Sequence, residues 1–345
     1  MALAQFDFHG VVVRVECDDA EILGRILEDF RYFCRSASAI PDQDPCHLSI
    51  QAFRRAPDYA ALPPIRATIY SPRNICYSQG DITYIDYFGR ALSIYNRRQN
   101  SLEIFSERLH LLHEVIFLTI LSRAGEELER KGMHRIHALA MERNGKCALF
   151  MLPSGGGKTT LGMGILQQDT PYRLLSEDSP LVTRDGRILP FPLRFGLVSK
   201  EKPDVAPEYL IYLERMEFEP KYLISLRAFE GRISEGAALP RMLFIGERTL
   251  APACTIQKVG RAKGLKALVR HMIVGVGLYQ GVEFLLQSSI MDLFRHARLF
   301  FSRMRAGLAM LRQSKVYVVA LGRNPQQNLA DILSFLDAEG LGVKG

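Results

Sequence analysis

Short apolar runs alternate with turn residues through the first hundred positions of the chain. The runs are rich in β-branched and aromatic residues and are separated by Pro, Gly and Asn, which is typical of strands; they lie at 11–15, 67–71, 81–88 and 91–95. Between them, apolar side chains over 21–33 recur at helical spacing. The pattern predicts an N-terminal α+β subdomain over 1–105, with its strands in an antiparallel sheet.

A long helix is predicted next, because apolar residues recur at helical intervals from about 107 to 131 and Gly132 follows. Strand-like residues then lead to Asn144-Gly145, which is a strong hairpin signal. A second apolar strand, CALFML, runs directly into three consecutive glycines.

Helical and strand patterns continue after the glycines. A helix is predicted over 159–168, and strand-forming residues over 172–182 are broken at their polar centre. Strand, glycine loop, helix and strand in this order are typical of a mononucleotide-binding fold. We therefore expect an α/β nucleotide-binding core over 106–262.

The last part of the sequence is mostly helical. A strand candidate at 241–247 completes the core, and the region 263–345 contains one further strand at 315–321 and a closing helix at 324–336. No internal repeat and no low-complexity linker interrupts the chain.

Composition and charge narrow the class of protein. The six cysteines are scattered with no C-x-x-C pair, which favours reduced thiols over a disulfide framework or a zinc site. No signal peptide and no membrane span are indicated, so we expect a cytoplasmic protein. The net charge of +7 comes from the C-terminal quarter, because twelve Lys/Arg face five Asp/Glu from residue 261 onward.

The glycine loop has the chemistry of a phosphate site. Consecutive backbone N–H groups can converge on phosphate oxygens there, and a following helix N-terminus adds partial positive charge. Lys158 would reach the β- and γ-phosphates and the Thr159 hydroxyl would ligate Mg²⁺. Leu152 stands where the general pattern opens with a glycine. We expect ATP to contact Ser154, Gly155, Gly156, Gly157, Lys158, Thr159 and Thr160.

An acidic pair follows about 20 residues after Lys158. Glu177 and Asp178 stand where a strand parallel to the loop strand would end. In such a site one carboxylate can hold the Mg²⁺ shell while its neighbour accepts a proton from the attacking hydroxyl or water. The alternative is that both acids are exposed turn residues before Pro180.

The string from residue 136 to 192 resembles the core of the HPr kinase/phosphorylase-like family. That family has a His-bearing strand, a hairpin, a glycine loop ending in Gly-Lys-Ser/Thr, and an acidic pair about 20 residues further on. The resemblance covers roughly 134–198 and is closer to the divergent HPr-kinase-related proteins, some of which serve peptide-modification pathways. It implies a P-loop core of the type shared with phosphoenolpyruvate carboxykinase.

The resemblance also implies residue roles. His137 corresponds to the strand histidine near the γ-phosphate, and Lys158 and Thr159 to the phosphate and Mg²⁺ ligands. Glu177 corresponds to the proton acceptor and Asp178 to the second acid, which would also ligate Mg²⁺. The family usually has Asp at the first position, so the base could instead be Asp178. On residues alone, His137 could equally be a structural histidine.

Arginines supply the remaining candidate chemistry. Arg173 and Arg194 could neutralise charge on a transferring phosphoryl group. If 292–312 is one helix, Arg295, Arg298, Arg305 and Arg312 form a stripe that would suit an acidic peptide or protein, although a solvated face explains it as well. No nucleic-acid-binding module accompanies the stripe, and a homo-oligomer stays open.

The sequence therefore predicts an ATP- and Mg²⁺-dependent kinase that phosphorylates a Ser or Thr hydroxyl of a peptide or protein. Two alternatives stay open. The first is a P-loop ATPase that regulates a partner, and the second is a non-catalytic nucleotide-sensing protein. A phosphoenolpyruvate carboxykinase is disfavoured, because the chain is short for one and has no convincing dicarboxylate site.

Overall fold

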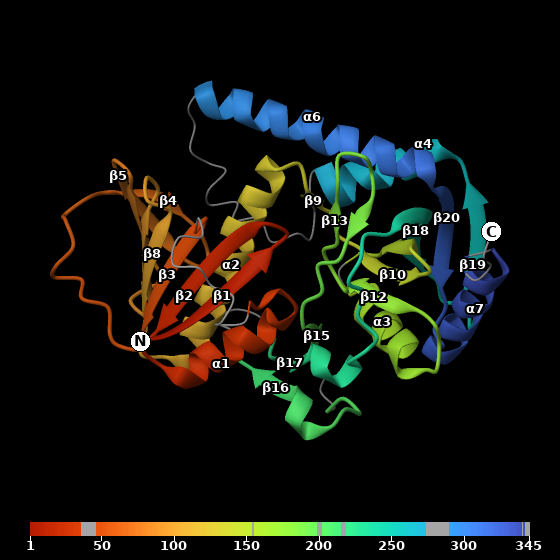
Figure 1. The fold of residues 1–345 in the computed structure, drawn as a ribbon, viewed down its shortest axis with the longest axis horizontal. Coiled ribbons are helices and arrows are strands. Elements are labelled where there is room, and N and C mark those ends of the chain that lie inside the picture. Colours follow the sequence, from red (N-terminus) through yellow and green to blue (C-terminus); the bar gives the residue numbers. More distant parts are fainter. Residues whose placement is uncertain are drawn as a thin grey trace. The chain divides into compact units, whose positions relative to one another are not determined.

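The protein has a mixed α/β fold with several sheets (Figure 1), seen here in a computed structural model. The structure describes residues 1–35, 46–153, 155–198, 202–214, 219–273, 290–339 and 341, without the side chains of 290–296. The chain forms two compact units, the first from Met1–Leu128 and Leu197–Ser225 and the second from Glu129–Gly196, Leu226–Leu278 and Ser289–Gly345, as far as these are described. The division into 1–105, 106–262 and 263–345 stays a prediction.

The first unit is built on an eight-stranded mixed sheet. Its strands are β1 (Ala2–Phe8), β2 (Val11–Cys17), β3 (Leu48–Phe53), β4 (Ala67–Tyr70), β5 (Ile75–Gln79), β6 (Ile82–Asp86), β7 (Leu92–Asn96) and β8 (Ser101–Phe105), in the order β1-β2-β3-β8-β7-β6-β5-β4. The predicted antiparallel sheet is wrong at β3, which runs parallel to both β2 and β8. A parallel neighbour needs a crossover, and the helix α1 (Ala20–Asp29) lies between β2 and β3 in the chain.

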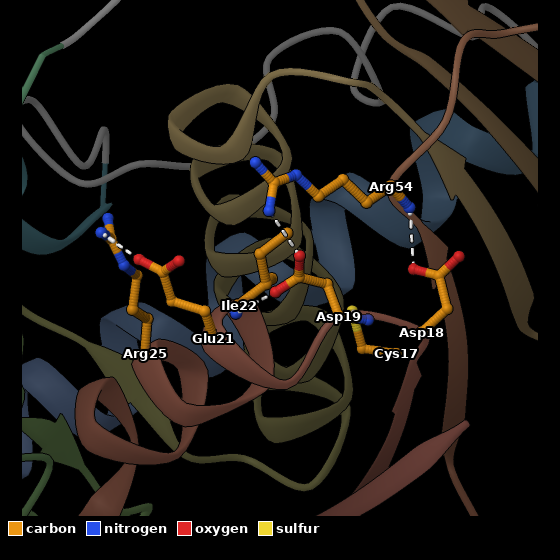
Figure 2. A network of polar contacts seen from close by, with 7 residues as sticks. All are labelled: Cys17, Asp18, Asp19, Glu21, Ile22, Arg25 and Arg54. Atoms are coloured by element: carbon orange, nitrogen blue, oxygen red, sulfur yellow. Dashed lines mark hydrogen bonds and ion pairs between the residues drawn. The ribbon is translucent and has the colours of Figure 1, made fainter.

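A polar network fixes the start of α1 (Figure 2). Asp19 caps the helix, since its Oδ1 accepts a hydrogen bond from the Ile22 N–H at 3.0 Å. The Arg54 guanidinium lies 2.7 Å from Asp19 Oδ2, and the Arg54 N–H donates to Asp18 at 2.8 Å. Because Asp18 follows β2 and Arg54 follows β3, the network joins the helix start to the ends of two parallel strands.

Helix α2 (Leu109–Arg130) closes the core of this unit with α1. His113 Nε2 lies 2.7 Å from Asp29 Oδ2, and both side chains are buried. The Phe117 ring stacks on Phe30 with 5.2 Å between centroids. The unit also includes the short turn η1 (Arg31–Phe33), the turn η3 (Pro207–Tyr209) and the antiparallel pair β16 (Leu210–Leu213) and β17 (Lys221–Ile224).

The second unit contains a six-stranded sheet that carries the glycine loop. Its strands are β12 (Arg173–Ser176), β10 (Leu139–Arg143), β11 (Lys146–Met151), β18 (Leu239–Arg248), β20 (Lys315–Leu321) and β19 (Thr255–Val259), in that order. β11, β18 and β20 are parallel, and β12 has the same direction because β10 is antiparallel to both β11 and β12. The carboxyl ends of these four strands therefore lie at one edge.

Helices cover both faces of this sheet, because successive side chains of a strand point to opposite faces. The buried side chains of Leu149 and Met151 belong to one cluster with those of α4 (Arg261–Leu268) and α6 (Ile290–Gln313). On the other face, the Phe244 ring contacts both Phe150 and Phe335 of α7 (Pro325–Ala338). Helix α3 (Lys158–Gln167) packs beside α7.

Smaller elements complete the second unit. They are the three-stranded sheet of β14 (Ile188–Leu189), β13 (Leu181–Val182) and β9 (His134–Arg135), the turn η4 (Leu226–Phe229) and the π-helical turn η5 (Val269–Ile273). Strand β15 (Phe195–Leu197) lies where the chain passes from the second unit to the first. None of the described helices is both long and apolar enough to cross a membrane.

Most predicted elements are confirmed. The turn at Asn144-Gly145 has positive φ at both residues, 54° and 72°, as its sequence indicates. The run 172–182 is broken between β12 and β13. The predicted helices at 107–131, 159–168, 292–312 and 324–336 correspond to α2, α3, α6 and α7.

Candidate functional site

The glycine loop joins β11 to α3 at the carboxyl edge of the six-stranded sheet. Gly155 and Gly157 have φ of 70° and 102°, which only glycine adopts without strain. Gly157 caps α3, and the Gly156 N–H donates to the Pro153 carbonyl at 2.9 Å. Ser154 lies outside the described residues. The loop thus ends at a helix N-terminus, where unpaired N–H groups favour an anion.

Lys158 folds back over the start of the loop. Its Nζ donates to the Leu152 carbonyl at 3.0 Å and lies 2.8 Å from His137 Nε2. The Asp178 carboxylate is 3.7 Å from the same Nζ. Only 7% of the Lys158 side chain is exposed, so its charge is held in one place by three partners.

His137 lies between Lys158 and Asp178. Its Nδ1 is 3.1 Å from Asp178 Oδ1, an ion-pair distance without the alignment of a hydrogen bond. The backbone fixes this geometry, since the Ile136 N–H donates to the Pro180 carbonyl and the Ala138 N–H donates to the Asp178 backbone carbonyl, extending the pairing of β9 with β13. His137, which comes 21 positions before Lys158, and Asp178, which comes 20 positions after it, thus meet beside the Lys158 ammonium group.

Glu177 contacts a different part of the loop. Its Oε1 accepts a hydrogen bond from the Thr159 hydroxyl at 2.5 Å. Adjacent acids therefore point at different partners, because consecutive residues after β12 project in different directions. Thr160 is exposed in the first turn of α3.

In the site, burial and the neighbouring charges have opposite effects on the pKa of Asp178, and also on that of Lys158. Burial raises the pKa of Asp178, but the close contact with His137 and the charges of His137 and Lys158 outweigh it, so that the pKa lies below its usual value. Burial lowers the pKa of Lys158, and the Asp178 and Glu177 charges oppose that shift only in part. The carboxylate is therefore ionised at neutral pH and the ammonium is only partly stabilised.

His271 belongs to the site although no sequence signal pointed to it. Its carbonyl accepts the His137 N–H at 2.9 Å, and its ring stacks on the His137 ring with 6.0 Å between centroids and 9° between planes. Burial, followed by the charges of His137 and neighbouring cations, lowers the pKa of His271 to about 4. It lies in η5, and π-helical turns are frequent at functional sites.

The structure places the candidate arginines differently from what the sequence suggested. Arg173 opens β12, so its backbone lies at the opposite end of that strand from Glu177 and Asp178, and its role in neutralising a transferring phosphoryl group stays a prediction. Arg194 is buried, and burial lowers its pKa to about 9. Arg248, at the carboxyl end of β18, is exposed and its Nη1 would be 3.9 Å from a Cβ on Gly157. Arg248 directly follows the predicted strand at 241–247, and pairing of that strand with the loop strand is what brings it to the site.

Oxygen donors for a hard cation are present in the site. Thr159 and Glu177 supply a hydroxyl and a carboxylate, and Mg²⁺ is usually held by one or two such protein ligands together with substrate phosphates. Across the described part of the chain, no group of three or more His, Cys, Asp and Glu side chains is arranged to hold a metal ion. The residues fit a shared protein-and-phosphate metal site.

Comparison with known proteins adds no family. The sequence matches no protein-family model and no curated protein.

Proposed function

We propose that this protein is an ATP- and Mg²⁺-dependent kinase with an HPr-kinase-like P-loop core, acting on a Ser or Thr hydroxyl of a peptide or protein. The observation that carries the proposal is the convergence of Lys158, His137 and Asp178 beside a glycine loop at a helix N-terminus. A structural lysine would need no such loop, and a solvated acidic turn would not contact two buried basic groups.

The loop and Lys158 are proposed to hold the phosphates. The backbone N–H groups of Gly155, Gly157, Lys158 and Thr159 would face the phosphate oxygens, and Lys158 would leave the Leu152 carbonyl to meet the β- and γ-phosphates. Thr159 and Glu177 would hold Mg²⁺, which neutralises phosphate charge when bound. Arg248 is exposed beside the loop and can add a further positive charge.

The two acids are proposed to have separate roles. Glu177 contacts the Thr159 hydroxyl and so belongs on the metal side. Asp178 is ionised, lies against His137 and is free of the metal-side hydroxyl, so it is the better candidate to accept the proton from the attacking hydroxyl. This assignment exchanges the roles that the family resemblance implies for these positions.

The acceptor is proposed to be a peptide or protein and not a small molecule, on the resemblance alone. Label transfer from γ-labelled ATP tests the function directly. Purified protein with Mg²⁺ is incubated with and without a host peptide and protein extract, beside Lys158→Ala and the exposed-lysine control Lys258→Ala.

Label on an extract component that is lost in Lys158→Ala and kept in Lys258→Ala supports the kinase. Release of free phosphate alone, whether or not extract is present, would instead indicate an ATPase. Tight ATP binding without turnover would indicate a nucleotide sensor, and no ATP binding would overturn the P-loop assignment itself.

A further inference from the structure

Helices α4 and α6 of the second unit lie side by side and are antiparallel (Figure 1). A Cβ on Gly264 would contact Leu311, and one on Gly307 would contact Leu268, so each helix turns a glycine toward the other. The Arg261 guanidinium donates to the Arg312 carbonyl at 3.2 Å where the pair ends. The outer sides of both helices therefore form one continuous surface.

The described side chains of the two helices make this surface basic, because they include exposed cations and no acid. Seven cations on it are exposed, and neither 261–273 nor 297–313 contains Asp or Glu; the cations are Arg261, Lys263, Lys266, Arg270, Arg298, Arg305 and Arg312. Charges within about 10 Å add up at physiological salt when no opposite charge neutralises them. An anionic partner is therefore favoured over a neutral one.

Large apolar side chains lie among these cations. Phe301 is 68% exposed and its neighbour Phe300 is 45% exposed, while Leu265 and Val269 on the α4 side are each more than a third exposed. At 3.6 residues per turn, Arg298, Phe301, Arg305 and Arg312 fall within an arc of about 60°. Ordinary solvated helix faces leave aromatic residues out of such an arc.

We propose that this α4–α6 face binds the surface of an anionic lipid bilayer. A helix face that combines arginines with exposed phenylalanines is typical of helices that lie in the membrane interface, where the cations meet lipid phosphates and the rings enter the acyl boundary. The described part of α6 that carries exposed residues, 297–313, is about 25 Å long, so several headgroups can be contacted at once.

A bilayer fits this surface better than an acidic peptide. An arginine cluster alone can recognise an acidic peptide, but the exposed phenylalanines among these cations have no role in that contact, whereas a bilayer takes up both the charges and the rings. Electrostatic attraction to an anionic leaflet is worth about a fivefold change in partitioning per Lys or Arg near the surface. The proposal does not depend on kinase activity.

Vesicle co-sedimentation of the full chain tests the proposal. Vesicles of phosphatidylcholine alone are compared with vesicles that contain phosphatidylglycerol as well. The protein is expected to sediment with the anionic vesicles only, and less so as salt is raised. Arg298→Glu with Arg305→Glu should weaken partitioning at least about twentyfold. The matched pair Arg66→Glu with Arg98→Glu, exposed in the first unit, makes the same charge change and should have much less effect.

A second variant separates lipid insertion from simple charge attraction. Phe301→Ser keeps the net charge and should still weaken partitioning about tenfold, since the ring no longer enters the acyl boundary. Unchanged thermal unfolding of each variant shows that the fold is intact. Failure to bind anionic vesicles, an equal loss in the control pair, or binding of soluble poly-glutamate in place of vesicles would overturn the proposal.

Discussion

Glu177 and Asp178 are adjacent in the chain, but their side chains contact different parts of the candidate site. Glu177 contacts the Thr159 hydroxyl, whereas Asp178 contacts His137 and lies near the Lys158 ammonium. The sequence predicted that both acids serve the site, but it left open which one is the base, because the direction of each side chain depends on how the chain leaves β12.

Separate replacement of the two acids should give different defects. If Asp178 is the proton acceptor that we propose, Asp178→Asn should lower kcat by about 10²–10⁴ with ATP affinity changed little. Glu177→Gln should instead raise the Mg²⁺ concentration needed for half-maximal activity. Steady-state assays at varied Mg²⁺ concentration distinguish the two defects. The reverse pattern would indicate that Glu177 is the base.

The lowered pKa of His134 predicts that the second unit loses folding stability in acid. Burial, followed by the charges of Arg303 and Arg184, lowers its pKa from 6.5 to about 4. Between these values the unfolded chain binds a proton that the folded protein does not, so stability falls as pH falls through this window. At pH 5 the loss is about 2 kcal/mol.

The variant His134→Gln keeps a group that can pair with Ser302, to which His134 Nε2 lies 2.8 Å, but it cannot titrate. Urea unfolding at pH 7.5 and pH 5 should show a smaller pH-dependent loss of unfolding free energy in the variant than in the parent protein. Equal losses in both would mean that His134 does not control this acid sensitivity.

At the scale of elements, the prediction is strongest where local chemistry alone fixes the structure. The Asn144-Gly145 hairpin, the glycine loop and β20 follow from turn residues and a short apolar run. His271 was missed because its helix comes 113 positions after Lys158 and only the fold brings it to His137. The parallel placement of β3 was missed since pairing between distant strands leaves no local pattern.

The glycine loop allows a matched test of backbone conformation. Gly157→Ala and Gly145→Ala both place a side chain at positive φ, 102° and 72°, where a Cβ costs about 1–2 kcal/mol. Neither added Cβ would meet a described atom closer than 3.9 Å beyond its chain neighbours. Both variants should lose stability, but only Gly157→Ala should lose ATP affinity in calorimetric titration. Similar ATP affinities in the two variants would mean that the glycine loop does not bind the nucleotide.

At the scale of the whole molecule, the first unit needs more of the chain than its strands. Asp29 is paired with His113 and Phe30 stacks on Phe117, and both partners lie on α2 beyond residue 105. A predicted subdomain that ends at 105 leaves Asp29 and Phe30 without these partners and the core without its covering helix.

Two fragments test this requirement. Residues 1–130 are expected to show a cooperative thermal transition, whereas residues 1–105 should show none, because the second lacks the helix that covers the core. Far-UV circular dichroism during heating measures the difference. Equal cooperative transitions in both fragments would mean that the eight-stranded sheet and α1 suffice.

The packing of Leu152 against Gly246 makes room for a large side chain at the position where the general phosphate-loop pattern has glycine. A Cβ on Gly246 would lie 1.9 Å from Leu152 Cδ2, so the bare backbone of β18 makes the space that the larger side chain fills. The small residue thus lies on the adjacent strand and not in the loop. The two positions should therefore covary among homologues, and Gly246→Ala should be rescued when Leu152→Gly accompanies it. A search pattern that demands glycine at the first position alone would overlook every protein built on this exchange.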